Sequence, residues 1–349
     1  MDKSKVKIVL IGNGFDIAHG LKTRYADFLE FLSIDTYKNG KDCRNRKYSQ
    51  YKHRIASNDI EDPWITVKLD PNKGYELNVN PHNERNSIYF KRLFLEKKDP
   101  ASMKWADLET FYFNLLIEKK DDSSVIKTIN EEFAYMKVLL EDYLINQIET
   151  LGVNKFDIDS NSIMKLLNND KDFDQIYFIT FNYTSKILDY YYERLSMSSL
   201  VTGEPYNKKF LMKPIHIHGK LNNEKNPIIF GYGDENSADY QELEDSLNDD
   251  LLVNFKTFQY LRTENYNQVL GLLNTTNDIT VQIIGHSCGL CDKALLRKIF
   301  QHENVKRIQA VYHGDDSNYF SKLYSISRIF DDNTLMREKI IPLVSTAGI

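Results

Sequence analysis

The residues best suited to chemistry lie in four short segments, each following a run of β-forming residues. These segments are 11–16 (IGNGFD), 180–184 (TFNYT), 216–219 (HIHG) and 285–289 (GHSCG). In an open parallel sheet, ligands bind beyond the carboxyl ends of the strands. Segments far apart along the chain are therefore expected to meet at one edge of one sheet.

The first segment has a Gly-x-Gly turn between a strand and a helix. This geometry, here Gly12-Asn13-Gly14, places backbone N–H groups against phosphate. The third glycine of a dinucleotide fingerprint would fall at Ile17, so the full pattern is missing and a plain tight turn is the alternative. Because a carboxylate beside phosphate would repel it, Asp16 is expected to cap the helix or to bind a ribose hydroxyl.

The second and third segments supply an amide and two imidazoles. Asn182 ends an apolar strand, and its side-chain amide can both donate and accept hydrogen bonds. Helix capping by Asn182 or Thr184 is the alternative. His216 and His218 stand two apart on an expected strand and so share a face. His218, nearer the strand end, is the candidate general base. A metal site and a structural histidine are the alternatives, and the latter suits His216 better.

The fourth segment, 285–289, satisfies G-x-S-x-G, the nucleophile elbow of α/β-hydrolases. A hydrolase using Ser287 would need an acid and a histidine downstream, for which Asp292 and His313 are available. Little chain remains to complete that fold, so this interpretation ranks below nucleotide binding.

Three cysteines leave one unpaired, which fits a reducing cytoplasm better than a disulfide framework. Cys288 and Cys291 are either a redox pair with a low pKa or two buried small residues, the interpretation we prefer. With only Cys43 elsewhere they cannot form a four-cysteine zinc site, and no metal is expected.

Runs of β-forming residues alternate with helical patterns in the second half of the chain. This alternation predicts an α/β fold whose open parallel sheet, of Rossmann type and about six strands, is covered on both faces. The expected strands are 6–11, 175–181, 213–218, 279–285, 307–312 and 339–343. The expected helices include 290–300 and 318–330.

A long segment interrupts this pattern after the first strand–helix unit. Residues 105–151 show strong helical periodicity, whereas 36–105 are polar and without a sustained period. We therefore expect an α/β core formed by 1–35 and 171–349, and a mostly helical insertion or cap formed by 36–170. Residues 38–54 carry seven Lys or Arg against one acid. They are interpreted as a solvated face of the insertion, with contact to nucleic acid or a phage component as the alternative.

Composition excludes several classes of protein. The 349 residues are 42% hydrophobic and 27% charged, as in globular proteins and unlike disordered or fibrous chains. The net charge of −5 argues against general binding of nucleic acid. No apolar run approaches the ~18 residues of a membrane span, so no membrane partner is expected.

Together the four segments resemble the nucleotide-binding loops of sirtuins, in the same order along the chain. Residues 12–14 with Gly20-Leu21 are similar to the G-A-G-I-S-x-x-S-G-I-P loop, 180–182 to T-Q-N, 218–219 to H-G, and 285–287 to G-T-S. The match has departures: the four zinc-binding cysteines of a deacetylase are missing, Thr184 stands where T-Q-N-x-D has its acid, and Asp16 replaces a serine. The missing zinc module argues against an acyl-lysine peptide as substrate.

A more particular resemblance covers both halves of the chain. The opening IGNGFDIAHGL at 11–21, with Thr23 and the following YADF at 25–28, resembles the AbiH family of bacterial phage abortive-infection proteins. The segment Trp105-x-Asp107-Leu108-Glu109 adds to this resemblance, although its two carboxylates diverge on a helix and have no evident chemical role.

These resemblances imply a phage-defence effector that cleaves NAD, or a related nucleotide, at the N-glycosidic bond. Asn182 would orient a ribose hydroxyl or the attacking water, and His218 would take a proton from that water. The residues expected to hold the nucleotide are Gly12, Asn13, Gly14, Phe15, Asp16, Thr180, Gly219, Gly285, His286 and Ser287.

Other functions stay open on the same residues. The loops suit a sensor that binds NAD without cleaving it, and less well a serine hydrolase or a metal-dependent hydrolase. The nucleotide is the expected partner, while a phage-derived trigger and a homo-oligomer stay open.

Overall fold

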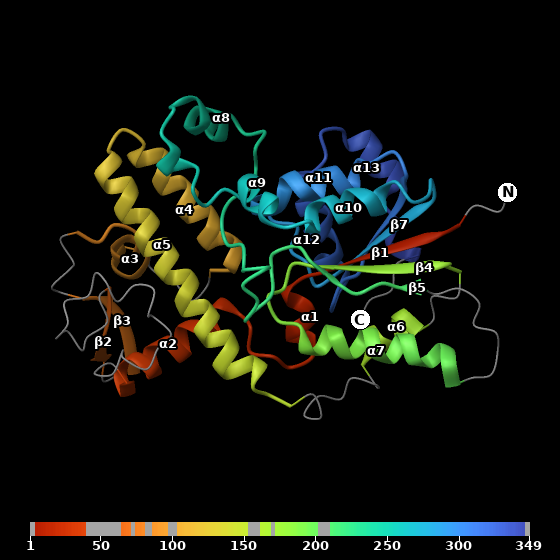
Figure 1. Cartoon of the computed structure of the whole chain (residues 1–349), viewed down its shortest axis with the longest axis horizontal. Coiled ribbons are helices and arrows are strands. Elements are labelled where there is room, and N and C mark those ends of the chain that lie inside the picture. Colours follow the sequence, from red (N-terminus) through yellow and green to blue (C-terminus); the bar gives the residue numbers. More distant parts are fainter. Residues whose placement is uncertain are drawn as a thin grey trace.

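The computed structural model describes most of the chain, including the four segments that could do chemistry (Figure 1). The described residues are 4–39, 64–70, 74–80, 86–96, 103–152, 161–168, 172–201 and 210–345. Residues 40–54 of the basic stretch 38–54 lie outside these described residues.

A parallel sheet forms the centre of the molecule, in the order β5-β4-β1-β7-β8. Its strands are β1 (Val6–Ile11), β4 (Gln175–Thr180), β5 (Phe210–Leu211), β7 (Ile279–Ile284) and β8 (Val305–Ala310). The short β6 (Ile215–His216) pairs with β4 off this path. The predicted α/β class and parallel sheet are therefore confirmed.

Helices cover both faces of this sheet because its central strands are apolar on both sides. In β1, Val9 and Ile11 join one hydrophobic core, while Ile8 and Leu10 join the other. In Figure 1, α1 (Asn13–Ala18), α6 (Ser162–Asn168) and α7 (Lys186–Val201) lie below the sheet, and α10 (Asn265–Leu273) and α11 (Lys293–Phe300) lie above it.

Two expected strands differ from the prediction. Within 213–218 only β6 is a strand: Pro214 before it has no N–H to donate to a neighbouring strand, and a turn at 217–218 ends it. The expected strand 339–343 is wrong: α13 (Asn333–Lys339) occupies its start, and a single bridge joins Ile308 to Ile340. Pro342 ends that pairing for the same reason as Pro214.

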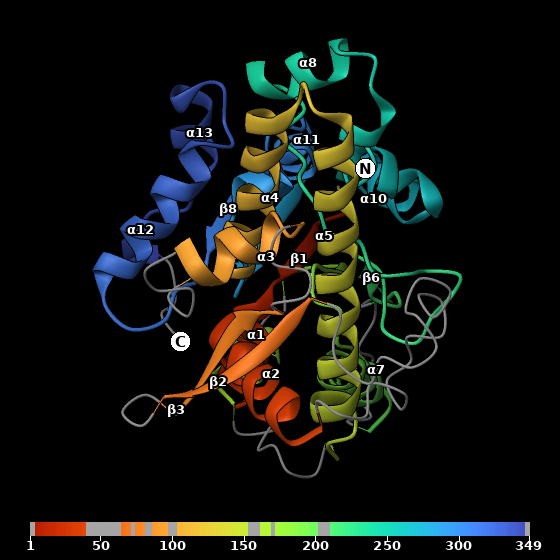
Figure 2. The same ribbon diagram turned by 90° about the vertical axis from the view of Figure 1, so that its left-hand side faces the viewer.

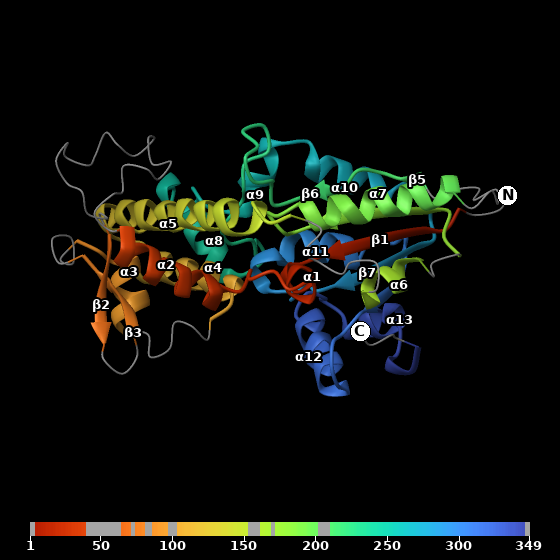
Figure 3. The same cartoon turned by 90° about the horizontal axis from the view of Figure 1, so that it is seen from below.

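A helical layer lies beyond one end of the sheet, as Figure 3 shows. It contains α2 (Tyr25–Asn39), α4 (Trp105–Lys119), α5 (Ser123–Tyr143) and the short α3 (Tyr89–Lys91). Figure 2 shows α4 and α5 side by side, and a hairpin, β2 (Ile65–Asp70) and β3 (Gly74–Val79), below α4 and beside α5. This hairpin corrects the expectation that 36–105 lack regular structure, because apolar residues alternate with polar ones over 65–69.

Short elements complete the fold. They are α8 (Ala238–Asp245), α9 (Lys256–Gln259), α12 (Asp316–Ser327), η3 (Arg92–Glu96), η5 (Leu144–Glu149), η7 (Asp249–Leu251), η8 (Tyr260–Arg262), η9 (Leu290–Asp292) and η10 (Leu343–Ser345). Among the residues that the structure describes, no helix has the length and apolar character needed to span a bilayer.

One hydrophobic core runs from the sheet into the helical layer. Phe230 lies between them, with its ring 4.8 Å from Phe133 of α5 and 6.4 Å from Trp105 of α4. The division into an α/β core and a helical insertion stays a prediction.

The pairing register aligns the carboxyl ends of the central strands. Ile11 lies between Thr180 and Ile284, and Thr180 also pairs with His216. The segments that follow these four strands therefore leave the sheet at one common edge, where they can contact one another.

Candidate functional site

The four segments meet at this edge. The side-chain amide of Asn182 donates to the carbonyl oxygen of Gly12 at 3.1 Å, and the amide of Gly14 donates to the carbonyl of Gly285 at 2.8 Å. The ring of Phe181 lies 4.1 Å from that of His286 and 5.0 Å from that of His218, measured between centroids. One compact centre thus contains residues from both ends of the sequence.

Glycine is required where the first and fourth segments touch. A Cβ at Gly12 would lie 2.4 Å from the Cα of His286, and one at Gly285 would lie 2.2 Å from the nitrogen of Phe15. Gly285 also has a φ of +69°, in the region that disfavours other residues. The amide of Gly12 donates to the carbonyl of Ile284 at 3.0 Å. Contact of this turn with a pyrophosphate stays a prediction.

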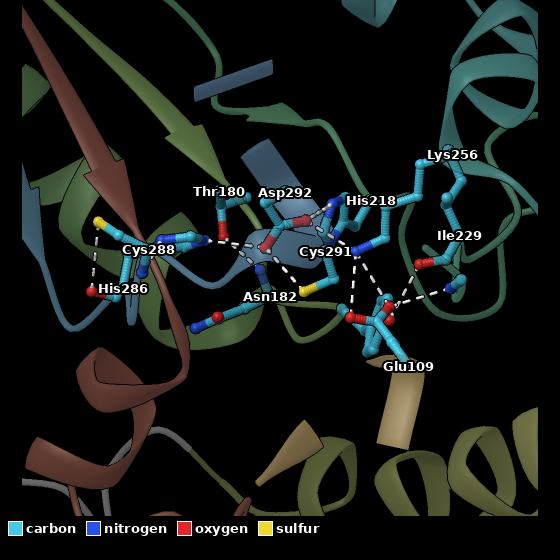
Figure 4. Close-up of polar contacts among 12 residues, drawn as sticks. Glu109, Thr180, Asn182, His218, Ile229, Lys256, His286, Cys288, Cys291 and Asp292 are labelled. Atoms are coloured by element: carbon cyan, nitrogen blue, oxygen red, sulfur yellow. Dashed lines mark hydrogen bonds and ion pairs between the residues drawn. The ribbon is translucent and has the colours of Figure 1, made fainter. Parts of the chain in front are cut away.

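A buried lysine forms the centre of the polar cluster (Figure 4). The ammonium of Lys256, on α9, lies 2.7 Å from Asp292 Oδ1 and 3.0 Å from Glu109 Oε1. The Lys256 side chain is only 1% exposed. Attraction to the two carboxylates, Asp292 above all, outweighs burial and raises the pKa of Lys256 well above its ordinary value. Lys256 is therefore a buried cation at neutral pH.

Asp292 connects this lysine to two histidines. It occupies the N-cap position of α11, yet its carboxylate makes no capping bond. Instead it lies 3.1 Å from Nε2 of His218 and 3.4 Å from Nε2 of His286. Burial alone would raise the pKa of Asp292, but the charge of Lys256 and the histidine hydrogen bonds lower it well below its ordinary value. Asp292 is therefore ionised.

The hydrogen bonds assign the tautomers of both histidines. The amide of Cys288 donates to Nδ1 of His286 at 3.0 Å, so the ring proton is on Nε2 and faces Asp292. In His218, Nε2 faces the ionised Asp292, with the Tyr260 hydroxyl also 3.1 Å away. A proton on Nε2 satisfies the carboxylate and leaves the basic lone pair on Nδ1.

Burial, together with the charge of Lys256, lowers the pKa of His218 to about 4. The ring is therefore neutral at pH 7, which is the form that can accept a proton.

The two histidines of the third segment do not share a strand face. His216 lies in β6, whereas His218 lies in the turn that follows, closed by a bond from the Gly219 amide to the His216 carbonyl at 3.0 Å. Nδ1 of His216 is buried without a partner, and its pKa is lowered to about 4 by burial and then by Lys220. The expectation of paired imidazoles was wrong because the strand ends before His218.

Asp16 does not cap α1, which corrects one of its two expected roles. The N-cap of that helix is Gly12, and the buried carboxylate of Asp16 accepts a hydrogen bond from the Thr184 hydroxyl. Burial raises the pKa of Asp16 to about 7. Asp16 therefore joins α1 to the segment that follows β4, and a bond to ribose stays a prediction.

The remaining predicted residues are placed around this centre. Asn13 donates to the carbonyl of Thr23 at 2.9 Å, and the buried Phe15 packs against the rings of His19 and Tyr191. The Thr180 hydroxyl accepts a hydrogen bond from the backbone N–H of Asn182 at 3.0 Å.

The serine-hydrolase alternative lacks its triad. Ser287 and His313 are both exposed, and Asp292 instead faces His218 and His286.

The cysteines do not suit redox chemistry. Cys288 and Cys291 are buried, and burial raises the pKa of Cys288 to about 11, so neither is a ready thiolate. Within the described ranges no group of three or more His, Cys, Asp or Glu could hold a metal ion.

Sequence reasoning missed the acidic and basic centre of the site. In the sequence, Glu109 has no evident chemical role, Asp292 is a candidate only as the acid of a hydrolase, and no pattern singles out Lys256. Lys256 stands 147 residues from Glu109 and 36 from Asp292, so no local spacing joins them. Only the fold brings these charges together.

The fold and the site define an α/β protein with a charged, buried centre at the carboxyl edge of a parallel sheet. The family model described as bacteriophage abortive infection AbiH matches residues 8–313, a span that contains the whole centre. The chain therefore belongs to the AbiH family, as the sequence resemblance predicted. Neither the curated proteins nor the solved structures gave a match. The likeness to sirtuins stays a prediction.

Substituting Gly285 by alanine should destabilise the protein by at least ~2 kcal/mol, because a Cβ there combines positive-φ strain with a backbone clash. Gly271, in α10, has nothing within 4 Å of an added Cβ. Gly271→Ala should stabilise by ~0.5–1 kcal/mol. Urea unfolding of both variants measures this, and equal effects would contradict the close approach.

Removing the buried cation should cost more than removing an exposed one. Lys256→Met leaves Glu109 and Asp292 without their counter-charge and should lower the free energy of unfolding by about 3–5 kcal/mol. Lys220→Met breaks a 3.1 Å pair with Asp189, but those side chains are 35% and 41% exposed, so it should cost less than ~1 kcal/mol. Chemical denaturation compares the two, and a loss at Lys256 no larger than at Lys220 would argue against the buried cation.

Stability should fall as the pH drops from about 6.5 to 4. Over this interval the unfolded chain protonates His216 and His218 while the folded chain does not, and each lowers the free energy of unfolding by roughly 3 kcal/mol between pH 7 and 4. Asp16, with its raised pKa, contributes in the opposite sense between about 4 and 7. His216→Gln should therefore flatten the dependence relative to the wild type. Unfolding midpoints between pH 4.5 and 7.5 test this, and parallel curves would refute it.

Proposed function

We propose that this AbiH protein is a phage-defence effector that hydrolyses NAD, or a related nucleotide, at the N-glycosidic bond to ribose. The observation that carries the proposal is the pairing of His218 with the ionised Asp292 at the sheet edge where Asn182 contacts Gly12. An Asp–His pair with a defined tautomer is a common arrangement for activating water.

The reaction needs little acid catalysis. The bond between the ribose C1′ and the nicotinamide nitrogen breaks, and its electron pair leaves with nicotinamide, which becomes neutral. The cation that develops on the ribose is attacked by water, whose oxygen bonds to C1′. Nδ1 of His218 takes the proton of that water, and Asn182 orients the water or a ribose hydroxyl. The products are ADP-ribose, nicotinamide and a proton.

The nucleotide would lie across the segments that meet at the edge. In this proposal the Gly12–Gly14 turn holds the pyrophosphate, and Ser287, which is exposed beside the buried His286, holds the adenosine side. No metal takes part, since nicotinamide needs no Lewis acid to depart.

The centre is closed to solvent in this structure. His218 is 5% exposed and Asn182 7%, and Tyr260 lies against His218. A substrate would reach them only after the covering residues move, which suits an enzyme that must be silent until infection. In the proposal a phage-derived trigger causes that movement.

The same burial favours a second candidate function. A sensor that binds NAD without cleaving it needs no access of water to His218. The two candidates differ in whether the nucleotide is recovered intact.

Chromatography of NAD incubated with the concentrated full-length protein tests the proposal. The wild type should release nicotinamide, and His218→Gln should lose about 10²–10⁴-fold of that rate because the base is gone. His216→Gln is the matched control: it alters a similarly buried imidazole two residues away that does not face Asp292, and should keep the rate within about twofold.

To supply the trigger, the measurement is repeated in phage-infected cells. There the NAD concentration should fall with the wild type and not with His218→Gln. Equal NAD loss with both proteins would refute His218 as the base. Intact NAD that binds in a calorimeter would select the sensor, and intact NAD without binding would refute both candidates.

A further inference from the structure

Glu109 stands out because it is the only part of the site that comes from the helical layer among the contacts described above. Its carboxylate accepts from the Gly231 amide at 3.0 Å and pairs with Lys256. From there the contacts continue through Asp292 to Nε2 of His218. All four side chains are at most 8% exposed, so the chain of contacts is shielded from water.

We propose that Lys256, held in place by Glu109, is a positioning residue that sets the tautomer and the basicity of His218. This inference rests on the proposed function, in which His218 is the base. Lys256 touches neither the ring nor the expected substrate directly, and acts through the carboxylate of Asp292.

The charges that face the imidazole of His218 set its protonation state. Asp292 attracts a proton toward His218, and without a cation nearby the two would form a buried ion pair with a protonated ring. The ammonium of Lys256, 2.7 Å from the same carboxylate oxygen, competes for that negative charge. His286 also donates to Asp292, whereas Tyr260 contributes only a hydroxyl. The ring therefore stays neutral, and its proton stays on Nε2.

Glu109 helps to hold the ammonium of Lys256 in place. A lysine with Asp292 as its single partner could follow that residue's side chain, whereas a second carboxylate, from α4, also holds the ammonium (Figure 4). The bond from Gly231 fixes Glu109 in turn. The position of α4 is thereby transmitted to the sheet edge through two ion pairs.

Nuclear magnetic resonance of ¹⁵N-histidine-labelled full-length protein tests the inference without any substrate. In the wild type, two-bond ¹H–¹⁵N correlations should show His218 as the neutral Nε2–H tautomer between pH 6 and 8. A proton on Nδ1 would overturn the proposal, whatever the behaviour of any variant.

Lys256→Met should raise the pKa of His218 by about one unit or more, a tenfold gain in proton affinity, because the competing cation is lost. Lys220→Met, which removes an exposed cation paired with Asp189, should leave the His218 titration where it is. A folded Lys256→Met protein with an unchanged His218 titration would overturn the proposal. If that variant does not fold, the tautomer of the wild type decides.

Turnover gives a separate readout. The acid limb of the pH dependence of NAD cleavage should move upward in Lys256→Met by the shift seen in the His218 titration, whereas a merely structural defect would lower the rate at every pH. Failure of the proposed function appears as no cleavage by the wild type. Failure of this inference appears in the spectra, so the two are distinguishable.

Discussion

The ammonium of Lys256 between two buried carboxylates is the interaction on which the rest of the site depends. Taking a charge out of water costs several kcal/mol, and only close counter-charges with good geometry offset that cost. Here the counter-charges come from different parts of the fold, Glu109 from the helical layer and Asp292 from the edge of the sheet. Without the lysine, these two acids would be like charges in one apolar pocket. Folding must therefore bring all three together.

The parallel sheet explains how such distant residues reach one another. Its register aligns the carboxyl ends of β1, β4, β6 and β7, and the glycines of the first and fourth segments let two backbones approach within contact. Phe181 fills the space between the rings of His218 and His286. The apolar ring excludes water, which strengthens the charged contacts beside it. Packing and electrostatics thus support the same geometry.

The sequence predicted what short-range patterns encode. Alternating β and α periodicity predicted the parallel sheet, and the glycine-rich segments predicted the edge at which the candidate site lies. Prediction failed where a local turn interrupts the pattern, as at residues 217–218, where a turn ends β6 before His218. It also failed for Lys256, whose partners are fixed only by the fold. Asp292 stands at the N-cap position of α11, and only its contacts show that its side chain serves the histidines instead.

The residue that covers His218 and the lysine that charges the site lie on one short segment of the chain. Lys256 is the first residue of α9, and Tyr260, which lies against His218, begins the η8 turn that follows directly. Tyr260 covers the imidazole, while Lys256, on the same segment, holds the carboxylate that faces it. The packing of this one segment therefore governs both the access to His218 and the charge around it.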